Sequence, residues 1–441
     1  MVIVDQLNVQ TGQPRKKFIA ILLGLSVLAG CSVPEISDFE MGAVLDGKAA
    51  SEPPVVAEEA MVEPMVLPAL PDAGTASTGA SRRGVVTAGD IDDGLNLDAF
   101  KRYQSRAAKD LDLPRANLLT PVQVQMVGPD NRPAPGVSYT LRKPGAPDPF
   151  HSGYSGVDGR ISVFPASLGA NRQSKVELRA FENGEEVLRK VLTTGERNRV
   201  TVPASEGWTP DFLDLVFVFD TTGSMGDELA WLTKEFAGIV RQARRAAPGV
   251  DVRYGLVAYR DVGDDYEVQN YGFTDQKREM QSWLRKLDAN GGGDYPEAAD
   301  RALHAAVNLD WRRGKGERII FHIADAPPHK QGALSYVRAA QIAAGQNVQI
   351  FGLGASGVGA ESEYLMRQAS VLSGGRYLFL TDDSGVGNSH AEPDIACYRV
   401  TALKDLLVRV LASELSGVRN EATDSAVLRE VGNYANGVCL Q

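Results

Sequence analysis

The sequence predicts an α/β protein with a doubly wound, mostly parallel sheet, a small β-sandwich domain ahead of it and a disordered N-terminal tether. Three observations predict this order. After residue 212, apolar runs rich in β-branched and aromatic residues alternate with amphipathic helical patterns. Before that, short strands of alternating apolar and polar residues are separated by Gly, Pro and Asn turns. Residues 32–82 show neither pattern.

Composition excludes several classes of function. The chain has 441 residues, a formal charge of −10 and 43% hydrophobic residues, which fits two or three folded domains. The acidity, with no basic stripe of interleaved aromatic residues, argues against a nucleic-acid partner and is compatible with divalent cations or basic partners. The three cysteines form no C-x-x-C pair and the five histidines no H-E-x-x-H motif, so zinc sites of these kinds are excluded.

Residues 1–30 are typical of an export signal. Three basic residues at 15–17 precede an apolar run that is short for a transmembrane helix and fits a secretory signal peptide. Leu28-Ala29-Gly30-Cys31 resembles the lipobox of bacterial lipoproteins. The resemblance implies cleavage before Cys31, acylation of this cysteine with palmitate, and a bacterial cell-envelope protein, with Ser32 favouring the outer membrane over the inner membrane. The alternative is a plain cleaved signal with an incidental cysteine.

Residues 31–112 are expected to form a lipidated flexible tether. Up to about Arg82, prolines recur among alanine, glutamate, valine and serine, a composition that cannot bury a core. Between Ile91 and Phe100 an acidic turn leads into a short helical pattern, so we expect a short ordered segment that packs on a neighbouring domain. The tether would let the folded part stand off the membrane.

The sequence pattern of residues 113–205 predicts a small β module. Alternating runs such as Val122–Val127 and Val137–Leu141, with hairpin chemistry at Asp158-Gly159, favour a β-sandwich. The order of strands and turns resembles the Ig-like or carboxypeptidase regulatory-like modules of bacterial surface proteins. No catalytic constellation lies here, so we expect a spacer or presentation role rather than ligand binding.

Residues 212–385 are expected to form the main domain. Strands are expected at Leu215–Phe219, Val252–Tyr259, Ile319–Ala324, Val348–Leu353 and Arg376–Leu380, and helices at Asp227–Arg245, Lys277–Leu287, Glu297–Leu309, Ala333–Ala344 and Glu361–Leu372. Strands spaced by helices indicate a mostly parallel sheet covered on both faces. Such sheets bind ligands beyond the carboxyl ends of their strands.

Oxygen-bearing side chains follow three of these expected elements. Asp220, Thr222 and Ser224 lie in Asp-Thr-Thr-Gly-Ser at a strand end, Asp294 follows a run of glycines, and Asp325 ends another strand. Carboxylates and hydroxyls are hard ligands that suit Mg²⁺, or else Ca²⁺ or Mn²⁺, rather than zinc. The sequence therefore predicts a divalent-cation site at this edge.

These motifs resemble a von Willebrand factor type A (VWA) domain, of the branch found beside alpha-kinases. The resemblance implies a Rossmann-like sheet and a metal-ion-dependent adhesion site (MIDAS), with Thr222 and Ser224 binding the metal directly and Asp220 and Asp325 directly or through water. A Glu or Asp side chain of a protein partner would complete the coordination of the metal. Asp294 departs from the Thr of many members, which should strengthen cation binding and weaken the attraction to an anionic partner group.

Two nearby acidic features have open interpretations. Glu297 either caps the following helix, which we favour, or reaches the metal site. The loop of Asp261, Asp264, Asp265 and Glu267 is expected to be solvated, the alternatives being a second cation site or a partner epitope.

Residues 386–441 are expected to form a C-terminal extension with an amphipathic helix that includes Leu403, Leu407 and Leu411. Cys397 and Cys439 stand on either side of this helix. In an oxidising periplasm they could form a disulfide, since their separation permits contact without requiring it.

The leading hypothesis for function is a non-enzymatic, lipid-anchored envelope binding or scaffold protein that uses a divalent cation to recognise a protein. Two alternatives remain. The metal could be purely structural and hold loops together, or the chain could be an aspartate-dependent phosphohydrolase with Asp220 as its nucleophile. The phosphohydrolase is disfavoured because that chemistry commonly needs a second acid two residues on, where this chain has Thr222.

Overall fold

The computed structural model describes residues 85–170, 174–203, 207–384 and 393–440, and the account below concerns these residues. The expected signal peptide 1–30 and the acylated Cys31 lie outside them. The strands of the main sheet are β9 (Phe212–Asp220), β10 (Asp251–Tyr259), β11 (Val268–Thr274), β12 (Gly316–Ala324), β13 (Gln349–Gly354), β14 (Tyr377–Thr381), β1 (Thr87–Ile91), β15 (Tyr398–Ala402) and β16 (Arg429–Val431). Their order across the sheet is β11-β10-β9-β12-β13-β14-β1-β15-β16.

The middle of this sheet is parallel. Strands β10, β9, β12, β13 and β14 run in one direction, whereas β11 is antiparallel to β10 and β1 is antiparallel to both of its neighbours. The prediction of a mixed α/β fold with a large, mostly parallel sheet is confirmed. Because Asp220 pairs with Tyr259 and Phe219 with Ile323, the carboxyl ends of β9, β10 and β12 meet at one edge.

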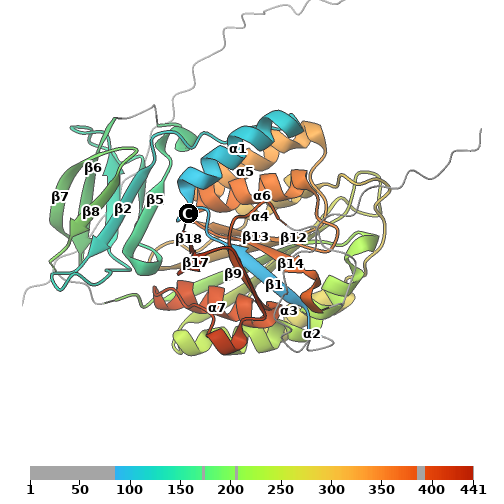
Figure 1. Ribbon diagram of the computed structural model, residues 1–441. Coiled ribbons are helices and arrows are strands. Elements are labelled where there is room, and N and C mark those ends of the chain that lie inside the picture. Colours follow the sequence, from blue (N-terminus) through green and yellow to red (C-terminus); the bar gives the residue numbers. More distant parts are fainter. Residues whose placement is uncertain (1–84, 171–173, 204–206, 385–392, 441) are drawn as a thin grey trace, which may run out of the picture. The chain divides into compact units, whose positions relative to one another are not determined.

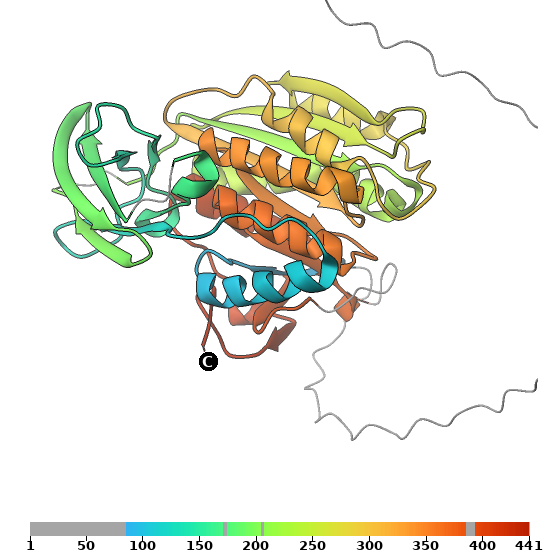
Figure 2. The same cartoon turned by 90° about the horizontal axis from the view of Figure 1, so that it is seen from above.

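Helices cover both faces of the sheet (Figure 1), as the alternation of apolar side chains along β9 requires. Leu215, Phe217 and Phe219 pack with α2 (Gly226–Ala243), α3 (Lys277–Lys286) and α7 (Leu403–Ser416). Val216 and Val218 face the other side, which is covered by α1 (Leu97–Leu111), α4 (Ala299–Val307), α5 (Ala333–Gly345) and α6 (Ala360–Ser373). Figure 2 shows α4, α5, α6 and α1 side by side on that face.

The main domain takes segments from both sides of the β module, which is a correction to the expected boundaries. The expected tether runs to residue 112 and includes a short ordered segment that packs on a neighbouring domain, but β1 and α1 belong to the main domain itself, and β1 is hydrogen-bonded between β14 and β15. Strand β15 and helix α7, which we placed in an extension after residue 385, complete the same sheet and its lower layer. The main domain is therefore interrupted by the β module rather than preceded by it.

The β module contains two small sheets that share one apolar core. One has the order β5-β2-β8 and the other β4-β3-β6-β7. The strands are β2 (Val122–Val127), β3 (Ser138–Arg142), β4 (His151–Tyr154), β5 (Arg160–Val163), β6 (Lys175–Glu182), β7 (Glu185–Thr193) and β8 (Arg197–Thr201). Its likeness to Ig-like or carboxypeptidase regulatory-like modules stays a prediction.

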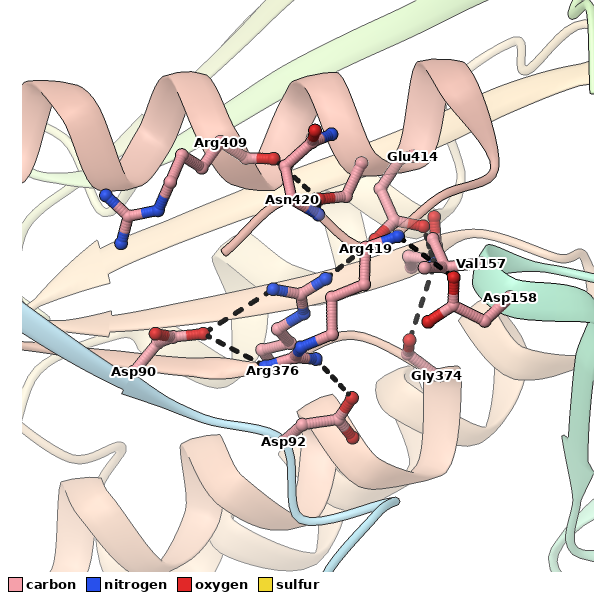
Figure 3. Close-up of polar contacts among 12 residues, drawn as sticks. Asp90, Asp92, Val157, Asp158, Gly374, Arg376, Arg409, Glu414, Arg419 and Asn420 are labelled. Carbon is pink, nitrogen blue, oxygen red and sulfur yellow. Dashed lines mark hydrogen bonds and ion pairs between the residues drawn. The ribbon is translucent and has the colours of Figure 1, made fainter. Parts of the chain in front are cut away.

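A buried ionic cluster, which we call the ionic junction, lies where the β module meets the main domain (Figure 3). Asp92, just after β1, accepts hydrogen bonds from Arg160 of β5 at 3.2 Å and from Arg419, which follows α7, at 3.0 Å. Asp90 lies 3.5 Å from Arg376. Carboxylates and guanidinium groups are thus matched inside this cluster, as buried charges require.

The C-terminal segment is fastened by a disulfide between Cys397 and Cys439. The bond joins the start of β15 to a short hairpin of β17 (Tyr434–Ala435) and β18 (Val438–Cys439). Within the described residues, no helix has the length and apolar character needed to cross a bilayer.

Candidate metal centre

The strand-end motif folds into a compact turn in which its oxygens converge. Strand β9 ends at Asp220, which is fully buried, and the carboxylate Oδ1 accepts hydrogen bonds from the backbone N–H of Thr222 at 3.0 Å and from its hydroxyl at 2.8 Å. The hydroxyls of Thr222 and Ser224 are 3.4 Å apart. The other carboxylate oxygen, Oδ2, is buried and has no hydrogen-bond partner among the described residues.

Asp325 joins this group from the end of β12. Its carboxylate accepts a hydrogen bond from Ser224, and its own backbone carbonyl accepts one from the hydroxyl of Tyr295 at 3.2 Å. The same tyrosine hydroxyl accepts a hydrogen bond from the backbone N–H of Gly359 at 2.7 Å. Tyr295 therefore fixes the loop before α4 against the ends of two neighbouring elements, while 45% of the residue stays exposed at the rim.

Four of the five predicted site residues thus lie together, and Asp294 does not join them. Its side chain is exposed, and within the described part of the chain it makes no hydrogen bond or ion pair. Glu297 takes the inner position instead, because its backbone N–H bonds to the carbonyl of Pro327 at 2.9 Å and draws the segment inward. Only 4% of Glu297 is exposed, and in the part of the chain that the structure describes its Oε2 has no hydrogen-bond partner.

The favoured capping role of Glu297 is therefore wrong. Helix α4 begins at Ala299, and its N-cap residue, Ala298, makes no side-chain cap. Caps are normally made by Ser, Thr, Asp or Asn, so the glutamate itself was a signal against capping. Gly292 leaves room for this carboxylate: a Cβ there would lie 2.9 Å from Glu297 Oε1, and its φ of +74° favours glycine.

The loop of acidic residues after β10 forms part of the wall and is not simply solvated. Asp264 accepts hydrogen bonds from the backbone N–H groups of Gly292 at 2.8 Å and Asp261 at 3.0 Å. Asp261 is buried and contacts His329 at 2.6 Å. These contacts, which sequence patterns did not predict, connect three loops around the centre.

The electrostatics of the centre are dominated by carboxylates without a matching cation. Burial, and then the charges of Asp325 and Asp261, raise the pKa of Asp220 to about 7. Burial, and then Asp220 and its acidic neighbours, raise the pKa of Glu297 to about 9. Burial also raises the pKa of Asp325. The buried Arg260 nearby is directed to Asp288 at 3.2 Å and Asp265 at 3.5 Å.

The residues present fit a hard divalent cation. Two buried carboxylate oxygens, Asp220 Oδ2 and Glu297 Oε2, lack partners, and two hydroxyls lie beside them. Across the described ranges, no three His, Cys, Asp or Glu side chains form a metal site by themselves. An ion at Asp220 would therefore need the hydroxyl oxygens of Thr222 and Ser224 as well, which is a donor set typical of Mg²⁺ or Ca²⁺.

Comparison with known proteins identifies the region that carries this centre. The family model of the von Willebrand factor A domain matches residues 214–381. An ariadne-like RING finger protein of Acanthamoeba polyphaga mimivirus is 32% identical over 117 residues, which are 26% of this chain and 11% of the relative. The alpha-protein kinase vwkA of Dictyostelium discoideum is 24% identical over 142 residues, 32% of this chain and 22% of the kinase.

A third relative, hemicentin-2 of Mus musculus, is 31% identical over 119 residues, which are 27% of this chain and 2% of hemicentin-2. The chain thus spans at most about a fifth of the length of these relatives. The similarity concerns one domain, and residues 214–381 form a von Willebrand factor A domain.

Proposed function

Starting from the von Willebrand factor A domain at residues 214–381, we propose that this chain is a non-enzymatic binding protein that recognises a protein partner through a divalent cation. The cation would be Mg²⁺, or else Ca²⁺ or Mn²⁺. The observation that carries the proposal is the buried Oδ2 of Asp220, which has no hydrogen-bond partner among the described residues and lies near the buried carboxyl groups of Glu297 and Asp325.

The chain's own residues have distinct roles in this proposal. Asp220, Thr222, Ser224 and Asp325 would hold the cation, and Glu297 would hold it directly or through water. When bound, the cation supplies a positive charge that attracts an oxygen ligand at the rim. Thr222 N–H orients the Asp220 carboxylate, and the Tyr295 bridge fixes the loop so that the rim keeps its shape.

The partner would contribute an oxygen ligand, with an Asp or Glu side chain as the expected donor. The burial of Glu297 bears on the strength of that contact. Three ionised carboxylates outweigh the charge of one divalent ion and leave no net positive charge to attract a fourth, so partner binding would be weaker than cation binding.

A purely structural metal is the second candidate, and this same observation favours it. Glu297 is almost fully buried and closes the inner side of the centre. In that case the cation would hold together the loops after β9 and β12 and the loop before α4 without any partner. The two candidates differ in one measurable property, which is whether a partner is lost together with the metal.

The cellular setting is part of the proposal. The signal-like residues 1–30 and the lipobox ending at Cys31 support a lipid-anchored protein of the bacterial cell envelope, with the outer membrane favoured. The Pro-rich stretch to Arg82 would serve as the spacer between the anchor and the domain that binds.

The experiment has two stages on the full chain. Magnesium chloride is titrated calorimetrically into the wild type, Asp220→Ala and the exposed control Asp130→Ala. Crosslinking pull-downs from envelope extracts then compare the same three proteins with Mg²⁺ and with EDTA. Loss of a recovered protein in EDTA and in Asp220→Ala, but not in Asp130→Ala, is the expected result.

The other outcomes separate the candidates. Magnesium binding with no change in the recovered proteins would overturn partner recognition and support the structural metal. No heat of binding for Mg²⁺, Ca²⁺ or Mn²⁺ would overturn both.

A further inference from the structure

A second charged region lies at the edge of the sheet opposite the metal centre. A pocket of about 390 Å³ is lined by four cationic side chains, Arg241, Arg244, Arg245 and Lys277, and by Val240, Pro248 and Tyr254. We call it the basic pocket. Tyr254 stands five residues before Tyr259 along β10, about 17 Å away at the rise of a strand, so the two sites are separate. No carboxylate lines the pocket.

These cations are not neutralised by the protein. Within the described residues, the side chains of Arg241, Arg245 and Lys277 form no ion pair or hydrogen bond, and the side chain of Arg244 makes only a hydrogen bond to the carbonyl of Val250, at 3.2 Å. The protein as a whole is acidic, with a formal charge of −10. A group of four cationic side chains without a carboxylate is therefore unexpected from its composition.

The helix dipole explains the position of only some of these cationic side chains. Arg241, Arg244 and Arg245 lie at the C-terminal end of α2, where cations interact favourably with the helix dipole. Lys277 has the opposite placement, because it is the first residue of α3, where the dipole disfavours a cation. The acidic residues near it are engaged elsewhere: Glu279 accepts a hydrogen bond from Thr274, and Asp275 one from Gln276.

Tyr254 adds a hydrogen-bond donor to this pocket. Only 3% of the residue is exposed, but its hydroxyl is not among the enclosed polar atoms, and it makes no hydrogen bond in the described part of the chain. The hydroxyl can therefore be reached from the pocket. The floor of the pocket therefore offers one free donor, and its walls offer guanidinium and ammonium groups.

We propose that the basic pocket binds a phosphate group, either free phosphate or the phosphate of an anionic lipid headgroup. The tyrosine hydroxyl would donate to one phosphate oxygen, and Arg245, from the turn after α2, and Lys277, from the start of α3, would donate to the others. Guanidinium and ammonium groups are the usual protein partners of phosphate, and their hydrogen bonds to it are strengthened by charge. This site does not depend on the metal centre.

The test uses the full chain at low ionic strength. Sodium phosphate is titrated calorimetrically, and binding to phosphatidylglycerol vesicles is compared with binding to phosphatidylcholine vesicles by sedimentation. Three variants are compared with the wild type: Arg245→Gln/Lys277→Gln, the conservative Tyr254→Phe, and the control Arg102→Gln/Lys109→Gln, which makes the same charge change on exposed residues of α1. Thermal melting verifies that each variant is folded.

Arg245→Gln/Lys277→Gln is expected to weaken binding by about tenfold or more, and Tyr254→Phe by about threefold to tenfold, with the control unchanged. Raising the salt concentration should weaken binding. Dependence on Arg245 and Lys277 seen only with phosphatidylglycerol vesicles assigns a lipid headgroup, whereas dependence seen with free phosphate assigns a soluble phosphate. Absence of both kinds of binding, or equal loss in the control, would overturn the proposal.

Discussion

Two buried groups of charges in this molecule are constructed in opposite ways. In the ionic junction, Asp92 faces Arg160 and Arg419, and Asp90 faces Arg376. In the metal centre, Asp220, Glu297 and Asp325 face one another, and the nearest buried arginine, Arg260, is turned to the outer loops.

The pKa values express this difference. Burial alone would raise the pKa of Asp92, but Arg160, Arg419 and Arg376 outweigh it and bring the pKa to about 2. In the metal centre burial acts in the same direction without opposing arginines, so the pKa of Asp220 rises to about 7 and that of Glu297 to about 9. The junction thus carries its own counter-ions, whereas the carboxyl groups of the centre have none among the described residues, and the proposed cation rests on this difference.

The largest expected loss of stability follows a substitution in the ionic junction. Arg419→Met leaves Asp92 and Asp90 buried without one of their shared cations, and should lower the free energy of unfolding by about 3–5 kcal/mol. Denaturant unfolding measures it. The exposed control Arg132→Met should stay within about 0.5 kcal/mol of the wild type. Equal stability of the two variants would mean that the junction does not hold the fold together.

The next effect concerns the metal. With Mg²⁺ at a hundredfold excess over its dissociation constant, the wild type should gain about 2.7 kcal/mol, and Asp220→Asn should lose this gain. In EDTA, Asp220→Asn should be no less stable than the wild type because it removes a repelled charge, whereas Asp92→Asn should be less stable. Melting with and without EDTA measures both. A strongly destabilised Asp220→Asn in EDTA would contradict the comparison.

The two regions should also respond to pH in opposite directions. A carboxyl whose pKa is raised on folding favours the folded state below its ordinary pKa, near 4, and this stability is lost as pH rises through about 7 for Asp220 and about 9 for Glu297. The metal-free protein should therefore lose stability between about pH 5 and pH 9, and Mg²⁺ should restore it. Melting temperatures across this range, with Mg²⁺ or EDTA, measure the effect.

For Asp92 the dependence of stability on pH has the opposite sign. Its lowered pKa contributes stability above the ordinary value near 4, and this contribution is lost as pH falls toward about 2. The variant Asp92→Asn should therefore flatten the acid limb of the stability curve, and Asp220→Asn the alkaline limb. A variant that flattened both limbs would show that the two regions are coupled.

The smallest expected effect separates Glu297 from Asp294. Glu297→Gln removes a buried charge beside Asp220 and should weaken Mg²⁺ binding by about tenfold. Asp294→Asn changes an exposed side chain and should alter the affinity by no more than about twofold. Calorimetric titration of both variants decides which of the two acidic residues belongs to the centre.

The sequence predicted what depends on periodicity. Alternating strands and helices gave the parallel core of the sheet, because a run such as Leu215–Phe219 must be buried on both faces. The same rule placed Asp220 and Asp325 at one edge, and the structure brings Thr222 and Ser224 to it.

What the sequence did not predict depends on contacts between distant segments. Strand β1 reads Thr-Ala-Gly-Asp-Ile, which is weakly apolar, and its partner Thr381 lies 294 positions away. The choice of Glu297 over Asp294 was decided by a backbone hydrogen bond to Pro327, which no local pattern encodes. The basic pocket likewise combines residues from α2, β10 and α3.

The position of β1 determines how the fold would bear tension. A pull on the chain ahead of residue 85 acts along β1, whose backbone is hydrogen-bonded to β14 on one side and β15 on the other. Because Thr87 pairs with Thr381 at the edge that carries Asp220, a force between an N-terminal anchor and a ligand at the metal centre would pass through β14, β13 and β12 to β9.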